Sequence, residues 1–276
     1  MKVIEPSVEI LKQEDFSIKG IKKFIEQCAR LSYKSEDKIT DDSYEKFVQM
    51  LIDKDHARPL EFGTVHLEID VCSRDIIIDT LTNRGMLNQL WWKETYKNGK
   101  VYVTTNYRYY LAIKKVYPNI DKYFTEEDNK YYPKRYTVHM ILDRGVMDEF
   151  RTHIALSSIA ESTRYCNYSK GKFGNEITCV IPRFITDITD DIKKSCTTIS
   201  WRMWMEQSEQ AYLSAIKTGW TPQQARGFLP LDVKSELIMC GFRDAWDNFF
   251  YRRCAVDAHP DARYIAEQLK DKIYEV

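Results

Sequence analysis

The chain has 276 residues, of which 43% are apolar and 30% are charged, and its 41 Lys and Arg residues balance 41 Asp and Glu residues. This composition excludes a disordered or fibrous chain, and the length suits one large domain or two small ones. A net charge of zero argues against general binding to nucleic acid or membrane surfaces, which needs a basic excess. Because no apolar stretch approaches the roughly 18 residues of a membrane span and the N-terminus is unlike a signal peptide, we predict a cytoplasmic protein.

Arginine is concentrated late in the chain. Residues 1–140 hold 6 Arg and 17 Lys, whereas residues 141–276 hold 10 Arg and 8 Lys. The planar guanidinium suits carboxylate and phosphate, so the second half could hold an anion, with ordinary surface ion pairs as the alternative. The seven cysteines form no CxxC pair and the five histidines share no metal-ligand spacing. We therefore predict reduced thiols and no metal site.

The first part of the chain predicts two helices and a strand. An apolar period indicates one helix over residues 20–32, and a second is expected over 41–53 with Asp41 or Asp42 as its N-cap. Residues 56–62 are predicted to form a loop because Pro59 disfavours a helix. Residues 64–71 alternate between apolar and polar side chains, which is typical of a strand with one buried face.

Residues 93–136 are unusually rich in tyrosine, with ten of the eighteen in the chain. We interpret this stretch as a partly strand-forming insertion whose rings pack on the main body. An aromatic surface that stacks nucleic-acid bases is the alternative. No internal repeat or low-complexity linker is evident, so the sequence predicts a single domain over residues 1–276.

The second half predicts mainly helices. Helices are expected over residues 148–157, 201–217, 233–254 and 261–274, with a short one beginning at Thr221, and a strand over 177–184 is interrupted by Pro182. Interleaved helices and strands with few βαβ units indicate an α+β fold. The absence of GxGxxG, GxxxxGK[ST] and GxSxG patterns argues against Rossmann, P-loop and α/β-hydrolase sites.

Polar side chains gather between residues 151 and 170. Arg151, Thr152 and His153 are followed by the run Glu161-Ser-Thr-Arg164. Hydroxyl donors beside arginine are what a phosphomonoester site needs. A polar helix end, in which Ser158 and Glu161 form a capping box, is an equally good interpretation of these residues alone.

Four blocks of sequence resemble the motifs of flavin-dependent thymidylate synthases. Glu161-Ser-Thr-Arg-Tyr-Cys-Asn-Tyr-Ser-Lys170 resembles the family signature, with His153 nine residues before Ser162 as in that family. His56-Ala-Arg-Pro-Leu-Glu61 is similar to the family's His-x-Thr-Pro-x-Glu-His, and Ala225-Arg-Gly-Phe-Leu-Pro230 is similar to its Ala-Arg-x-x-Leu-Pro. Residues 246–260 resemble its last helix. The blocks follow the family order over residues 56–260.

The resemblance implies a distinctive α+β fold, not Rossmann-like, with active sites between the subunits of a homotetramer. It implies that residues 1–276 are one catalytic domain for the reductive methylation of dUMP to dTMP. 5,10-Methylenetetrahydrofolate would supply the carbon, and NADPH would be the reductant acting through FAD. The alternatives are a divergent member that binds nucleotide or flavin with weak or altered activity, and a nucleotide- or RNA-binding module.

The resemblance also assigns site residues. Arg253 matches the catalytic arginine that stabilises the ionised uracil ring. No cysteine is implied as a nucleophile, and neither is Ser162. The residues implied to bind dUMP are Glu161, Ser162, Thr163, Arg164, Arg226 and Arg253. The residues implied to bind FAD are His56, Arg58, Arg151, Thr152 and His153.

Two departures from the family pattern concern positive charge. Thr152-His153-Ile154 stands where the family has Arg-His-Arg, and Arg151 lies one place earlier. A shift of one residue on a helix rotates a side chain by about 100°, so Arg151 would not simply substitute. Arg58 stands where the family has Thr. We hypothesise that Arg58 and Arg151 restore the lost charge from new directions.

Overall fold

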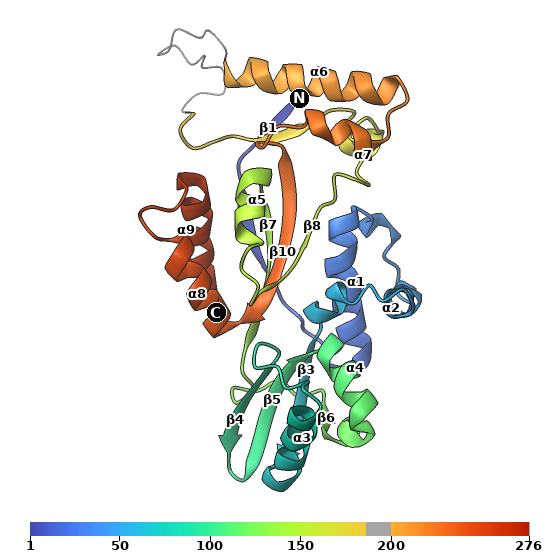
Figure 1. Ribbon diagram of the computed structural model, residues 1–276, viewed down its shortest axis with the longest axis vertical. Helices are drawn as coiled ribbons and strands as arrows, with labels where there is room; N and C mark the ends of the chain where they lie inside the picture. The colour runs from blue at the N-terminus through green and yellow to red at the C-terminus, as the bar shows by residue number, and fades with distance from the viewer. Residues whose placement is uncertain (186–199, 276) are drawn as a thin grey trace.

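The computed structural model describes residues 1–185 and 200–275, without the side chains of residues 32 and 33. Figure 1 shows an elongated molecule in three tiers. One end carries a long helix, a short helix and a small parallel sheet; these are α6 (Trp201–Lys217), α7 (Pro222–Ala225), β1 (Lys2–Ile4) and β9 (Thr178–Val180). A four-stranded sheet forms the middle tier, and a second one forms the other end.

The middle sheet is antiparallel throughout. Its strands, in spatial order, are β2 (Ser7–Leu11), β7 (Arg135–Asp143), β10 (Lys234–Phe242) and β8 (Ser157–Ala160). Three helices pack on one face: α5 (Arg144–Phe150), α8 (Arg243–Arg253) and α9 (Pro260–Glu275). Helix α1 (Ile18–Tyr33) packs on the other face.

The end sheet contains the hairpin with which the tyrosine-rich stretch begins. Its strands, in spatial order, are β4 (Trp92–Lys97), β5 (Lys100–Asn106), β3 (Thr64–Asp70) and β6 (Phe124–Thr125). It packs with α1 and with α2 (Ser43–Asp53), α3 (Val71–Asn83) and α4 (Tyr107–Val116). Six tyrosines of residues 93–136 are buried, which confirms that these rings pack on the main body: Tyr107, Tyr109, Tyr110, Tyr123, Tyr132 and Tyr136. That this stretch is an insertion stays a prediction.

The predicted α+β class is confirmed, because helices interleave with antiparallel sheets and the only parallel strand pair in the described part of the chain is β1 with β9. The helices predicted over 20–32, 41–53, 201–217 and 261–274 are present as α1, α2, α6 and α9. Thr221 caps α7 in a capping box with Gln224. The predicted loop at 56–62 contains the 3-10 helix η2 (Arg58–Phe62), in whose first turn Pro59 is tolerated. The other 3-10 helices are η1 (Glu36–Lys38), η3 (Pro118–Tyr123), η4 (Gly171–Phe173) and η5 (Arg226–Phe228).

The long helix predicted over residues 233–254 is wrong. Residues 234–242 form strand β10, and only residues 243–253 form a helix, α8. Leu237 and Met239 pack against the helices on one face of the sheet, while Ile238 and Cys240 pack against α1 on the other. A strand buried on both faces shows a continuous apolar run without alternation, and such a run cannot be told from a buried helix by its period.

The helix predicted over residues 148–157 is also wrong. Helix α5 ends at Phe150, and Ser157 begins β8 opposite Cys240 of β10. The exposed fraction of Ile154 is 89%, so it does not share a buried face with Phe150. Ser158 lies in β8, which rules out the helix-end capping box with Glu161. Here the pairing of β8 with the edge of β10 overrides the local helical pattern.

The structure reveals a repeat that the sequence analysis missed. The segments Thr64–Asp70 and Thr137–Asp143 share Thr, Val, His and Asp at the same four of seven positions. Each segment is a strand, β3 or β7, whose final Asp caps the helix that follows. Each pairs with an antiparallel strand that runs into another helix, and the register places Asp70 opposite Lys100 and Asp143 opposite Lys234. Two strand–helix pairs of the same design therefore build the two large sheets.

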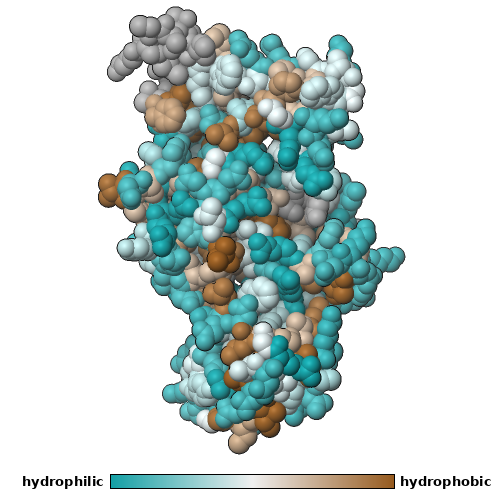
Figure 2. Space-filling model, viewed as in Figure 1, coloured by the Kyte–Doolittle hydropathy of each residue, from teal (hydrophilic) through white to brown (hydrophobic). Residues whose placement is uncertain are grey.

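Figure 2 shows hydrophilic side chains over most of one face of the molecule, with apolar residues scattered among them. Within the described residues, no helix has the length and apolarity needed to cross a membrane. Of the cysteines in this part of the chain, Cys28, Cys166, Cys179 and Cys240 are buried thiols. Cys196 lies outside the described residues.

The two equivalent cap residues should respond to pH in opposite ways. Burial raises the pKa of Asp143 from 3.8 to about 6, with Asp232 and Asp261 nearby adding to the effect. Hydrogen bonds from Ser73 lower the pKa of Asp70. Relative to an Asp143→Asn variant, the wild type should lose stability as pH rises from 3.8 to about 6, because the folded state keeps a proton that the unfolded state releases.

The matched variant Asp70→Asn should show the reverse trend, with the wild type gaining relative stability as pH rises, because a carboxyl with a lowered folded pKa stabilises only when ionised. Urea unfolding measures the two slopes, from pH 3.8 to about 6 for Asp143 and at and below pH 3.8 for Asp70. Slopes of relative stability against pH that have the same sign for both residues would contradict the opposite pKa shifts of Asp143 and Asp70.

Candidate active site

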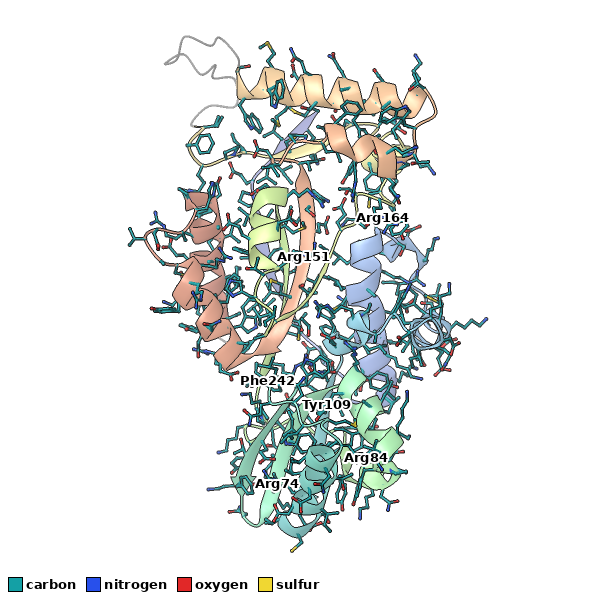
Figure 3. The ribbon with its side chains drawn as sticks, in the orientation of Figure 1. Arg74, Arg84, Tyr109, Arg151, Arg164 and Phe242 are labelled. Carbon is teal, nitrogen blue, oxygen red and sulfur yellow. The ribbon has the colours of Figure 1, made fainter. Side chains whose placement is uncertain are left out.

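An open cavity of about 620 Å³ brings together residues from two of the sequence blocks, 56–61 and 161–170, with Arg151 from the segment before the second block. His56 precedes η2 and Arg58 begins it, Arg151 comes from the turn after α5, and Ser162 comes from the segment after β8. Figure 3 shows Arg151 in the middle tier of the molecule. Four of the predicted site residues therefore line the same cavity, although they are up to 106 residues apart in sequence.

The wall of this cavity is organised by a buried carboxylate. The exposed fraction of Glu61 is 1%, and its Oε1 accepts a hydrogen bond of 2.6 Å from Nη1 of Arg108. Its Oε2 accepts from the hydroxyl of Ser157, and Nη1 of Arg58 lies 3.7 Å from the same oxygen. Glu61 thus ties η2, α4 and β8 together around the cavity.

Arg253 lies in a second cluster, where most of its donors are already engaged. Its Nε donates to Nε2 of His153 at 2.9 Å, and its Nη1 donates to a carboxylate oxygen of Glu149 at 2.8 Å. Its Nη2 donates to the carbonyl of Glu149 at 2.7 Å and to the hydroxyl of Thr152 at 3.1 Å. The end of α8 is thereby fixed to the turn after α5, so the predicted catalytic arginine meets two of the predicted FAD residues.

His153 is neutral in this cluster. Its ring is buried and lies 4.8 Å from the ring of Phe249. Burial, with Arg253 and Arg252 nearby, lowers the pKa of His153 to about 4. A neutral ring whose Nε2 accepts from Arg253 carries its proton on Nδ1.

Two arginines predicted to bind dUMP lie near α7. Nε of Arg164 donates to the amide oxygen of Gln223 at 3.0 Å, and Arg226 follows that helix and is exposed. In Figure 3, Arg164 lies above Arg151, toward α7. Neither arginine is part of the cavity wall.

Glu161 and Thr163 are buried and also lie off the cavity wall. A carboxylate oxygen of Glu161 is 2.8 Å from Nζ of Lys234, and Tyr168 donates to its other oxygen at 3.2 Å. This ion pair fixes the segment after β8 against β10. Their predicted contact with dUMP stays a prediction.

A comparison with protein families decides what kind of chain this is. The model described as "Thymidylate synthase complementing protein" matches residues 16–117 and 134–276. The chain belongs to this family. The predicted membership of the flavin-dependent thymidylate synthase family is thereby confirmed. The residues left out of the match, 118–133, fall within the tyrosine-rich stretch.

Solved structures and curated proteins add little to this family assignment. Two structures of the UMP/dUMP methylase PolB from Streptomyces cacaoi, bound with 5-Br dUMP and 5-Br UMP, align at a TM-score of 0.43 each. Their sequences are 14% and 13% identical to this chain, and the alignments cover all of it and 93% and 92% of those chains. No curated protein matches the chain.

Several residues of the site were not assigned by sequence reasoning. The cavity wall also includes Asp55, Arg108, Ser158 and Tyr165, and Glu149 holds Arg253. Arg108 could not be found because it lies in the tyrosine-rich stretch, outside all four sequence blocks. The displacement of Arg151 was argued on a helix, but Arg151 lies in the turn that follows α5. Among the described residues, no group of three His, Cys, Asp or Glu could hold a metal ion.

We predict that His153 titrates near pH 4 in an NMR experiment and that Arg253→Ala raises this pKa, because a nearby positive charge is removed. Since the folded pKa is lower than 6.5, the unfolded state takes up the proton first, and stability should fall as pH drops from 6.5 to about 4. Arg84→Ala, at an exposed arginine at the end of α3, is the control and should leave the titration unchanged. A wild-type pKa above 6 would contradict the hydrogen bond from Arg253.

Proposed function

We propose that the chain catalyses the flavin-dependent reductive methylation of dUMP to dTMP, with 5,10-methylenetetrahydrofolate as the carbon donor and NADPH as the reductant. The observation that carries this proposal is the convergence of His56, Arg58, Arg151 and Ser162 on one cavity. His56 and Ser162 come from two blocks that match the family pattern, and Arg58 and Arg151 lie at or beside the positions where this chain departs from it.

The donors in the cavity suit FAD. Arg58, Arg108 and Arg151 present guanidinium groups, which pair well with phosphate, and His56 adds a polar ring. The two arginines hypothesised to restore charge both line this space, which supports the hypothesis. Bound FAD would supply the hydride that it accepts from NADPH. The chain's own part is to bind and orient the cofactor and substrate.

Arg253 is positioned for electrostatic catalysis. Its guanidinium is held by His153, Glu149 and Thr152, so little reorganisation is needed when charge develops nearby. Neutral His153 accepts a hydrogen bond from Arg253 and adds no second cation to the cluster. We propose that Arg253 stabilises the ionised uracil ring and that Ser162, Arg164 and Arg226 bind the dUMP phosphate, with Glu161 and Thr163 supporting them.

The exposure of Arg164 and Arg226 outside the cavity favours a site that a second copy of the chain completes. We therefore retain the homotetramer with sites between subunits as part of the proposal. A cytoplasmic location is also retained from the sequence.

A divergent member of the family with weak activity is the second candidate. The observation in its favour is that four hydrogen bonds to His153, Thr152 and Glu149 engage the Arg253 guanidinium. Such an enzyme would bind flavin and nucleotide but release the C5 proton of dUMP slowly.

Tritium release from [5-³H]dUMP tests the proposal. Release should require FAD, NADPH and methylenetetrahydrofolate together, and Arg253→Lys should lower it by roughly 10²–10³-fold, as expected for the loss of one preorganised donor. Arg84→Ala is the control and should retain full release.

Two outcomes would contradict the proposal in different ways. A protein that binds flavin and dUMP but releases no tritium would be the divergent member. A protein that binds neither would contradict both candidates.

A further inference from the structure

Arg108 is an arginine of the cavity wall that none of the sequence blocks contains. It occupies the first turn of α4, which Asn106 caps by accepting a 2.9 Å hydrogen bond from the amide of Tyr109. Helix α4 continues from β5, the partner of β3 in the first strand–helix repeat. The end sheet therefore contributes this side chain to a cavity whose other arginines come from η2 and from the turn after α5.

Two contacts fix the guanidinium of Arg108. Its Nη1 donates to buried Glu61, and its centre lies 5.1 Å from the ring of Trp91. Glu61 is 1% exposed, whereas the side chain of Arg108 is still 40% exposed. Nη1 is the only nitrogen of Arg108 that donates a hydrogen bond within the described part of the chain. An arginine held in this way keeps free donors in a fixed orientation.

The wall of the cavity carries more guanidinium groups than carboxylates. Arg58, Arg108 and Arg151 share it with Asp55, while buried Glu61 pairs with Arg108 and Asp148 lies 3.8 Å from Nη1 of Arg151. The side chains of Arg58 and Arg151 are 56% and 48% exposed. Three guanidinium groups that come from three separate elements and face one space suit an anion with more than one charge.

We propose that Arg108 binds the diphosphate of the flavin dinucleotide in this cavity, together with Arg58 and Arg151. The inference rests on the proposed function, because it takes the occupant to be FAD. Glu61 is then a positioning residue, since it orients Arg108 without touching the ligand. The competing view is that Arg108 only neutralises buried Glu61.

Flavin binding separates these two views. FAD and riboflavin share the isoalloxazine ring, but riboflavin has no phosphate. Arg108→Ala should weaken FAD binding by roughly 10–100-fold, the effect of losing one charge-assisted hydrogen bond or a pair, and should leave riboflavin and dUMP binding within about twofold. The FAD affinity of Arg108→Lys should lie between those of Arg108→Ala and the wild type, and the FAD affinity of Arg84→Ala should match that of the wild type. Flavin fluorescence titration measures the flavin affinities, and calorimetry measures dUMP.

The substitution also removes the partner of a buried carboxylate, so Arg108→Ala could unfold the chain. The double variant Glu61→Gln with Arg108→Ala removes that carboxylate and is measured in parallel, with thermal unfolding as the check on folding. Equal losses of FAD and riboflavin affinity in the folded double variant would overturn the proposal. So would a loss confined to dUMP, or unchanged FAD affinity.

Inorganic pyrophosphate distinguishes failure of this proposal from failure of the proposed function. If the wild type does not bind FAD, the proposed function fails. The assignment of Arg108 to a diphosphate then stands only if the wild type binds pyrophosphate and Arg108→Ala weakens that binding at least about tenfold. A wild-type chain that binds neither FAD nor pyrophosphate overturns both.

Discussion

The buried carboxylate of Glu61 is the constraint on which the candidate site depends. An unpaired charge at 1% exposure would cost several kcal/mol, so the fold must bring partners to it. The partners are Arg108 from α4 and Ser157 from β8, with Arg58 close by. Glu61 thereby links α4 of the end sheet to β8 of the middle sheet. The cavity lies beside this link, and two of its arginines, Arg58 and Arg108, lie near Glu61.

The two strand–helix repeats contribute different residues to the candidate site. In the second repeat, Arg253 ends α8, the helix after β10, and hydrogen-bonds to His153, which lies in the turn after α5, the helix after β7. In the first repeat, the helix after β5 supplies Arg108, and the strand β3 follows directly on the η2 segment that holds Glu61. The two repeats have equivalent strands and equivalent Asp caps but position different side chains. The second repeat positions His153 and Arg253, and the first repeat positions Arg108.

Much of this could be predicted from the sequence, and the failures have a common cause. Amphipathic helices such as α6 and α9 have one buried face, so their period shows in the sequence. β10 is buried on both faces and β8 exists only because it pairs with β10, so neither has a local pattern to read. The blocks around His56, His153 and Ser162 were found because the family constrains their spacing. Arg108 and Glu149 were missed because only the tertiary fold brings them to the site.

We propose that the arginines divide between two ligands: Arg58 and Arg151 bind the flavin in the cavity, and Arg164 and Arg226 bind the nucleotide beside α7. The affinities for FAD and dUMP, measured on two double variants, test this division. Arg58→Ala with Arg151→Ala should weaken FAD binding by roughly 10²-fold or more and spare dUMP, whereas Arg164→Ala with Arg226→Ala should do the reverse. Unchanged FAD affinity in the first variant, or equal losses of both ligands in both variants, would contradict the account.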